Sequence, residues 1–228
     1  MDFQGFRPEA QEYLALVKRK DSKPWYDEHK EEQRRLLLEP FAALVTDLAP
    51  TFAEIDPALF ADPRKSVSRV RRDTRFTKDK HLYRDNMWFT AKPVPGEEWA
   101  RYPCFWFGLT PVDYSCGLGF YDAGPTVMER FRRAVARDID GFRAVVAGLA
   151  EQFPPQGETY KRDKDPTLPE DIRAWYNRRN LSVERVGAAA ESLYTPALAP
   201  QLRADFLALA PLYRFLKKAA QEGDLSHP

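Results

Sequence analysis

The chain has 228 residues, of which 43% are hydrophobic and 30% charged, a composition typical of a globular protein and unlike that of a disordered or fibrous one. Its 35 Lys and Arg against 34 Asp and Glu give a formal net charge of +1 at pH 7. This balance argues against a general polyanion binder, which would have a wholly basic face. The composition leaves open a local anion-binding site on a protein that is close to neutral as a whole.

Targeting and metal-binding signals are not evident. The N-terminus lacks the basic start and apolar run of a signal peptide, and no apolar stretch reaches the roughly 20 residues that span a bilayer. The three histidines (His29, His81 and His227) have no metal-ligand spacing, so no metal or cofactor is expected. We expect a cytoplasmic protein without a membrane partner, and its oligomeric state is left open.

The two cysteines, Cys104 and Cys116, lie in apolar segments that resemble strands. Buried thiols are the expected state in a cytoplasmic protein, with a disulfide between neighbouring strands as the alternative.

The first part of the chain predicts helices. One begins at Pro8, because apolar residues recur after it at helical spacing: Ala10, Tyr13, Leu14 and Val17. A second follows Ser22, an expected N-cap, with Pro24 in its first turn. We expect Pro40 to end or kink this helix, and the helical spacing that resumes afterwards to stop at Pro50.

The middle of the chain predicts strands. A short one is expected at residues 67–72, followed by aromatic-rich runs at 87–91, 104–109 and 114–121 with turn signals between them. Connections this short favour antiparallel neighbours, and therefore a meander. Gly119 and two further small residues of the last run leave bare backbone on one face, which either close packing or a flat ligand could occupy.

The sequence from Pro125 onward predicts more helices. They are expected in four places: after Pro125, after residues 138–141, at residues 170–177, and from Pro196 or Pro200. A polar loop at residues 158–169 and a possible strand at 181–186 lie between them, and residues 221–228 are expected to be a frayed tail. The whole predicts a single α+β domain over residues 1–228, with a central, mainly antiparallel sheet from the 67–121 region and helices from both ends of the chain packed on it.

Positive charge is concentrated in residues 64–84, which contain nine Lys or Arg and only two acids, Asp73 and Asp79. Converging guanidinium groups make a bidentate receptor for phosphate or carboxylate. The predicted ligand-binding residues are cations and aromatic rings of this region and of an early helix: Arg69, Arg72, Arg75, Lys80, Phe76 and Trp25. If a reaction follows binding, Asp73 and Tyr83 are the candidate catalytic, proton-transfer groups.

Three interpretations of this region stay open. The leading one is a pocket for a phosphorylated or carboxylated small molecule; the second is a nucleic-acid-binding module, with phosphates on the cations and a base on an aromatic ring. The third is a structural role in which the arginines are paired internally. The local backbone is open too: in an extended strand Arg69 and Arg71 share one face and Arg72 lies on the other, whereas a helical turn would align residues 69, 72 and 76.

Residues 69–83 carry the pattern RxxRDxRFxxxKxxY, which resembles the signature of a bacterial family of about this length, the domain of unknown function 2461. The usual pattern has Pro before the final Tyr, where this chain has Leu82. Lys23, Pro24 and Trp25 resemble an early Trp-containing segment of the same family. The resemblance covers nearly the whole chain and implies no activity.

A second basic patch follows the polar loop. Its cations are interspersed with acids: Lys161, Arg162, Lys164, Arg173, Arg178 and Arg179, with Asp163, Asp165, Glu170 and Asp171. A solvated surface of mixed charge is the expected interpretation.

Overall fold

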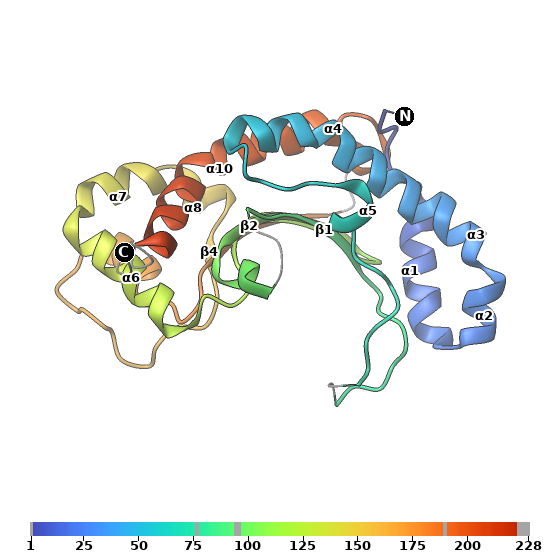
Figure 1. Ribbon diagram of the computed structural model, residues 1–228, viewed down its shortest axis with the longest axis horizontal. Helices are drawn as coiled ribbons and strands as arrows, with labels where there is room; N and C mark the ends of the chain where they lie inside the picture. The colour runs from blue at the N-terminus through green and yellow to red at the C-terminus, as the bar shows by residue number, and fades with distance from the viewer. Residues whose placement is uncertain (1, 76–77, 94–96, 189–190, 223–228) are drawn as a thin grey trace, which may run out of the picture. The chain divides into compact units, whose positions relative to one another are not determined.

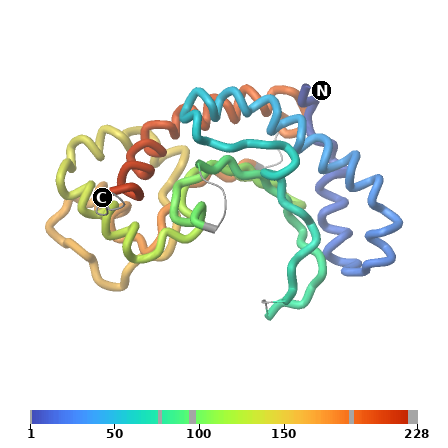
Figure 2. Tube along the Cα trace, viewed as in Figure 1, coloured from blue at the N-terminus to red at the C-terminus, as the bar shows by residue number. Residues whose placement is uncertain are grey.

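The computed structural model describes residues 2–75, 78–93, 97–188 and 191–222 (Figures 1 and 2). The chain forms two compact units. Unit 1 is made of Met1–Ala91, Trp106–Cys116 and Val186–Asp205, and unit 2 is made of Lys92–Phe105, Gly117–Arg185 and Phe206–Pro228. The expectation of a single domain stays a prediction, and most of the expected tail, residues 223–228, lies outside the described residues.

Five strands form one antiparallel sheet in the order β1-β2-β3-β5-β4. The strands are β1 (Met87–Ala91), β2 (Pro103–Leu109), β3 (Asp113–Phe120), β4 (Pro155–Gln156) and β5 (Ser182–Ala188). The first three are consecutive neighbours, which confirms the predicted meander. The sheet is not confined to the expected 67–121 region, because β5 pairs beside β3 and carries β4 at the edge.

The helices account for most of the remaining described chain. They are α1 (Pro8–Lys20), α2 (Lys23–Glu28), α3 (Lys30–Gln33), α4 (Glu39–Ile55), α5 (Pro63–Ser66), α6 (Gly124–Arg137), α7 (Ile139–Val146), α8 (Leu149–Gln152), α9 (Glu170–Tyr176) and α10 (Leu198–Gln221). A π-helical turn, η1 (Arg34–Leu38), and two 3₁₀ turns, η2 (Glu97–Arg101) and η3 (Glu191–Tyr194), complete the set. Sheet and helices together confirm the α+β class.

Two prolines, Pro40 and Pro50, lie in α4, and the helical run continues past both. The alternative that Pro40 ends the helix and the expected stop at Pro50 are therefore wrong, whereas a kink at Pro40 stays a prediction. Before Pro40 the backbone widens into the π-helical turn η1, where the Glu39 N–H bonds to the Arg34 carbonyl, and α4 then starts with Pro40 in its first turn. Widening avoids the clash between a proline ring and the preceding turn. Pro50 does not end the helix, which continues to Ile55. Thr51, Phe52 and Ile55 beyond it are buried, and their packing offsets the missing backbone bond.

The helical run Lys30–Ile55 is long and apolar enough to cross a membrane by length and composition. Its side chains Phe41, Leu44 and Phe52 are fully buried within the protein. The core helix of a soluble protein passes the same test, so this run is weak evidence for a membrane span. The expectation that the protein has no membrane partner stays a prediction.

Aromatic rings form the core of unit 1. Phe6 packs edge-on against Phe41 at 5.0 Å between ring centroids and stacks on Phe107 of β2 at 5.9 Å. On β1, Phe89 contacts Phe107 at 6.0 Å and Phe52 of α4 at 6.2 Å. A helix from the N-terminal part of the chain therefore covers β1, as predicted.

Unit 2 has an aromatic core of its own. Phe142 of α7 contacts Phe215 of α10 at 4.9 Å and Phe131 of α6 at 5.6 Å. Phe105 of β2 packs against Phe206 of α10 at 5.4 Å. The C-terminal helix therefore covers the unit 2 part of β2, again as predicted.

The bare backbone at Gly119 is used for close packing. A Cβ atom there would lie 2.4 Å from the Ser182 Cα on β5, so a ligand has no room at this position. Both cysteines are buried, and in the described chain they are thiols rather than disulfide partners. Burial raises the pKa of the Cys104 thiol to about 12, so it stays protonated and unreactive at neutral pH.

Candidate basic-arm site

Residues 67–85, which we call the basic arm, extend from the rest of unit 1 as two legs that run side by side (Figures 1 and 2). The first leg is the part before residue 76, and the second leg is the part after residue 77. The expected strand at 67–72 is reduced to single antiparallel bridges, Val67 with Phe89 and Arg71 with Tyr83. Backbone bonds from the Arg72 N–H to the Leu82 carbonyl (2.8 Å) and from the Arg84 N–H to the Val70 carbonyl (2.9 Å) join the legs. The predicted ligand-binding residue Phe76 lies outside the described residues.

The first leg is extended, which decides between the two local geometries left open by the sequence. Arg69 and Arg71 are exposed, Val70 between them is fully buried, and the Arg72 side chain is only 24% exposed. Alternation with period two is the mark of a strand and excludes a helical turn. Arg69 and Arg71 therefore share one face, and Arg72 lies on the other.

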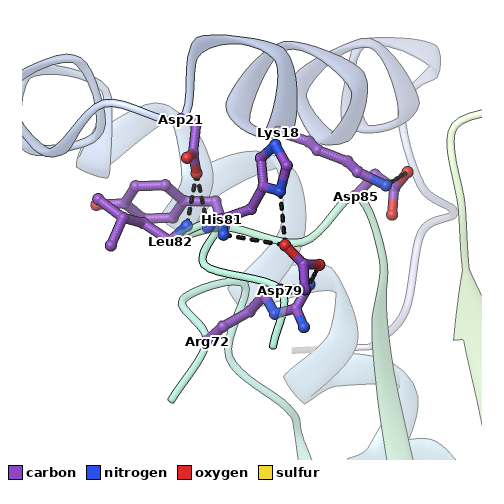
Figure 3. Close-up of polar contacts among 8 residues, drawn as sticks. Lys18, Asp21, Arg72, Asp79, His81, Leu82 and Asp85 are labelled. Carbon is purple, nitrogen blue, oxygen red and sulfur yellow. Dashed lines mark hydrogen bonds and ion pairs between the residues drawn. The ribbon is translucent and has the colours of Figure 1, made fainter. Parts of the chain in front are cut away.

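Asp21 ties the second leg to the end of α1. Its backbone is left-handed (φ 42°), a conformation that Asp tolerates better than most residues. Its carboxylate accepts the backbone N–H groups of Leu82 at 2.7 Å and Tyr83 at 3.1 Å, and Lys18 pairs with Asp85 at 2.8 Å beside it (Figure 3). The base of the arm is therefore fixed to a helix more than sixty residues earlier in the chain.

Tyr83 lies at the base of the arm as part of the core. It is 1% exposed and its ring stacks on Tyr26 of α2 at 4.7 Å, while the Tyr26 hydroxyl donates to the Gln33 side chain at 2.9 Å. Burial raises the pKa of Tyr83, so its hydroxyl stays protonated at neutral pH. Trp25 is half-buried and stacks on the His29 ring at 4.1 Å within the same helical segment.

Asp73 is engaged by an arginine of the arm. The Arg75 guanidinium donates from Nε to Asp73 Oδ1 at 2.9 Å and from Nη2 to Oδ2 at 2.6 Å, a bidentate pair. These hydrogen bonds lower the pKa of Asp73 to about 2. As a proton acceptor at neutral pH it would be weak, because its conjugate acid is so strong.

Asp79 is engaged twice, by His81 and by Arg72 (Figure 3). His81 Nδ1 lies 2.6 Å from Asp79 Oδ1, and because a carboxylate only accepts, Nδ1 carries the proton. The hydrogen bond from His81, followed by that from Arg72, lowers the pKa of Asp79. The contact with Asp79 orients the His81 imidazole. The contact between Asp79 and Arg72 links the second leg to the half-buried side of the first.

Four cations of the arm have no acidic partner in the part of the chain that the structure describes: Arg69, Arg71, Lys78 and Lys80. All four are exposed, and Lys80 Nζ donates to the Thr74 carbonyl at 3.0 Å. The three acids of the arm are all held by other side chains: Asp73 by Arg75, Asp79 by Arg72 and His81, and Asp85 by Lys18. None of them therefore offsets these four charges.

The structure thus separates the predicted ligand residues. Arg69 and Lys80 lie exposed, Arg72 and Arg75 are in ion pairs within the arm, and Trp25 is in a ring stack of α2. Sequence reasoning missed the anchoring role of Asp21, because its partners are distant in sequence and no local pattern marks them. Within the described ranges, no group of three His, Cys, Asp or Glu could hold a metal ion.

One family model matches the chain. Residues 9–215 match a family described as conserved hypothetical protein (DUF2461), and the match includes the whole basic arm, α2 and all of α1 except Pro8. A comparison with curated proteins finds no match.

Proposed function

The chain belongs to the DUF2461 family, and from the geometry of the basic arm we propose that the protein binds a ligand bearing phosphate or carboxylate groups. The observation that carries the proposal is the pairing within the arm. Asp73 and Asp79 are both engaged by neighbouring side chains, whereas Arg69, Arg71, Lys78 and Lys80 have no acidic partner among the described residues.

Arg69 and Arg71 are the central pair of this proposal. They are two residues apart on an extended leg, so their Cα atoms are separated by roughly 7 Å on the same face. Each guanidinium offers a planar fork of donors that matches two oxygens of a phosphate or carboxylate.

Arg72 has a different role in the proposal. It lies on the opposite side of the leg, and its guanidinium is held by Asp79. We assign it to holding the two legs together. Replacement of Arg72 would alter the shape of the arm before it altered any contact with a ligand.

A nucleic-acid backbone is the second candidate ligand. It is favoured by the exposure of the four cations, because a small-molecule pocket buries most of its ligand, whereas an extended polyanion lies along a surface. The two candidates differ in their response to salt. Binding to single strands releases counterions and weakens steeply as salt rises, with a slope of about −0.7 for each phosphate neutralised.

The test measures binding of pyrophosphate, citrate and a labelled single-stranded oligonucleotide at several salt concentrations. Arg69→Ala/Arg71→Ala should weaken binding at the arm by about a hundredfold or more, because two charge-assisted bonds are lost and each contributes about 1.5–3 kcal/mol. For the oligonucleotide the slope should also fall by about 1.4. Arg19→Ala/Arg35→Ala is the matched control, since it removes two exposed arginines from helical segments of unit 1.

Equal binding by the wild-type protein and the Arg69→Ala/Arg71→Ala variant would refute the proposal. An equal loss in the control variant would also refute it, since net charge alone would then explain binding. A slope that falls with the arm variant favours nucleic acid over a small molecule.

A further inference from the structure

Unit 2 contains an open hollow of about 770 Å³ lined by residues 158–164 and Arg179. The sequence predicted only a solvated surface of mixed charge here. The volume lies within the range of small-molecule sites, roughly 300–1,000 Å³. We call these lining residues the Tyr160 loop, after the ring at their centre.

The Tyr160 loop is folded around one buried side chain, Asn177, which is 9% exposed. Its amide donates to the Tyr160 carbonyl at 3.1 Å and to Asp163 at 3.0 Å, and its oxygen accepts the Lys164 N–H at 3.3 Å. In return, the Tyr160 N–H bonds to the Asn177 carbonyl at 3.0 Å. A buried amide with all these partners holds the loop in one shape, so the hollow is a built feature.

Three cations surround the Tyr160 ring. Lys164 Nζ lies 4.3 Å from the ring centroid, and the guanidinium carbons of Arg179 and Arg132 lie at 5.3 Å and 5.5 Å. Arg132 is 3% exposed and also donates to the Arg178 carbonyl at 3.2 Å. Cation–π contacts of this kind fix the ring. A nucleobase would therefore have to displace a cation before it could stack on Tyr160.

The acids of the Tyr160 loop are engaged, as they are in the basic arm. Asp163 is held by Arg173 at 3.0 Å in addition to Asn177, and Glu158 pairs with Arg179 at 3.3 Å. In the described chain Lys161, Arg162 and Lys164 form no ion pair, and the Tyr160 hydroxyl forms no hydrogen bond. Three charges and one hydroxyl are thus available at the hollow.

We propose that the Tyr160 loop binds the phosphate group of a small phosphorylated molecule. A phosphate monoester carries about −1.5 to −2 charge and three strong acceptor oxygens. Lys161, Arg162, Lys164 and the Tyr160 hydroxyl supply donors to such a group, whereas a single carboxylate would leave some of them unused. A base would have to displace a cation before it could stack on the ring, so the phosphate and not an attached base is the recognised group. This inference does not depend on the proposed function of the basic arm.

The test follows backbone amide signals of residues 158–164 by NMR while pyrophosphate is added to the full-length protein. Saturable shifts are expected, with ADP binding within a few-fold of pyrophosphate. Arg162→Ala should weaken binding by about tenfold, because it removes one charge-assisted contact and breaks no contact in the described chain. Lys164→Ala should weaken it at least as much. Arg133→Ala, an exposed arginine of α6 in the same unit, is the control and should leave the affinity unchanged.

Several results would overturn the proposal. Shifts that rise linearly through millimolar pyrophosphate, or an affinity unchanged in both loop variants, would exclude a phosphate site. Citrate binding as tightly as pyrophosphate would remove the phosphate assignment. Tighter binding of ADP by tenfold or more would mean that the base is recognised, and tighter binding of an oligonucleotide without terminal phosphates would assign the loop to a nucleic-acid backbone. Because the signals belong to the loop, the Arg69→Ala/Arg71→Ala variant should give the same titration, which separates this test from that of the arm.

Discussion

The basic arm and the Tyr160 loop have similar compositions and different construction. In each, cations outnumber acids, and the acids are engaged by neighbouring side chains. The arm is an extended pair of legs joined by a few backbone bonds and anchored by the carboxylate of Asp21. The loop is wound around a buried amide, Asn177, with its aromatic ring among cations. The first arrangement exposes charge along a surface, and the second gathers charge around a hollow.

The difference teaches that charge density alone does not locate a pocket. The sequence directed attention to the arm, where the excess of Lys and Arg is largest, and treated the second patch as solvated surface. A hollow needs contacts that hold a loop in one shape, and the hydrogen bonds of Asn177 supply them in unit 2. The predictions below test how far each region depends on its own anchor.

The largest expected effect is at Gly157, where the Tyr160 loop begins. Its φ of 103° is strained for any residue with a side chain, and a Cβ would lie 2.1 Å from the Asn180 carbonyl oxygen. Gly157→Ala should therefore lower the free energy of unfolding by about 4 kcal/mol, from strain and overpacking together. Chemical denaturation measures the loss.

Gly148→Ala is the matched control for Gly157→Ala. Gly148 also has a positive φ, 74°, but an added Cβ would meet nothing within 4 Å. We expect a loss of only about 1 kcal/mol in this control. If the two variants lost the same stability, the close approach of the Gly157 backbone to the Asn180 carbonyl oxygen would be contradicted.

The next effect is at Asp21, the anchor of the basic arm. Asp21→Ala removes the acceptor of two backbone N–H groups and places Ala in a left-handed conformation, so unfolding should become easier by about 2 kcal/mol. Asp21→Asn keeps an acceptor oxygen and tolerates the backbone, so it should lose less. Denaturation curves that coincide for wild type and Asp21→Ala would show that the arm does not depend on this anchor.

The smallest expected effect on stability comes from a substitution in the arm that mainly changes the titration of Asp73. Arg75→Ala should return the pKa of Asp73 from about 2 toward its ordinary value of 3.8, because the bidentate pair that favours the carboxylate is lost. A lowered pKa in the folded state means that this pair stabilises the protein above about pH 4 and that the contribution is lost as pH falls toward 2. Both side chains of the pair are largely exposed, 55% for Asp73 and 76% for Arg75, so the change in stability should be small.

Carbon NMR of the carboxyl groups as a function of pH measures this titration. Asp27 is the internal control, since Lys23 and Lys30 hold its pKa at about 2 by separate contacts that Arg75→Ala leaves intact. An Asp73 titration that is the same in both proteins would contradict the pairing seen in the arm.

The sequence by itself determined much of the local structure. Pro8 and Ser22 marked helix starts, and the aromatic runs with short connections predicted the meander of β1, β2 and β3. These features depend on residues close together in the chain, through capping, periodicity and turn chemistry. The concentration of charge in the arm, and its resemblance to a family signature, were visible in the same way.

Tertiary structure decided which groups meet. The sequence left open whether the backbone after residue 69 was extended or helical, and pairing with the second leg makes residues 69–72 extended. It did not indicate that Asp21 would bind Leu82 and Tyr83, or that Asn177 would organise the Tyr160 loop. Each of these contacts joins groups distant in sequence, and each polar group had several possible partners. Only the packed fold selects one of them, and that selection leaves some cations paired and others available to a ligand.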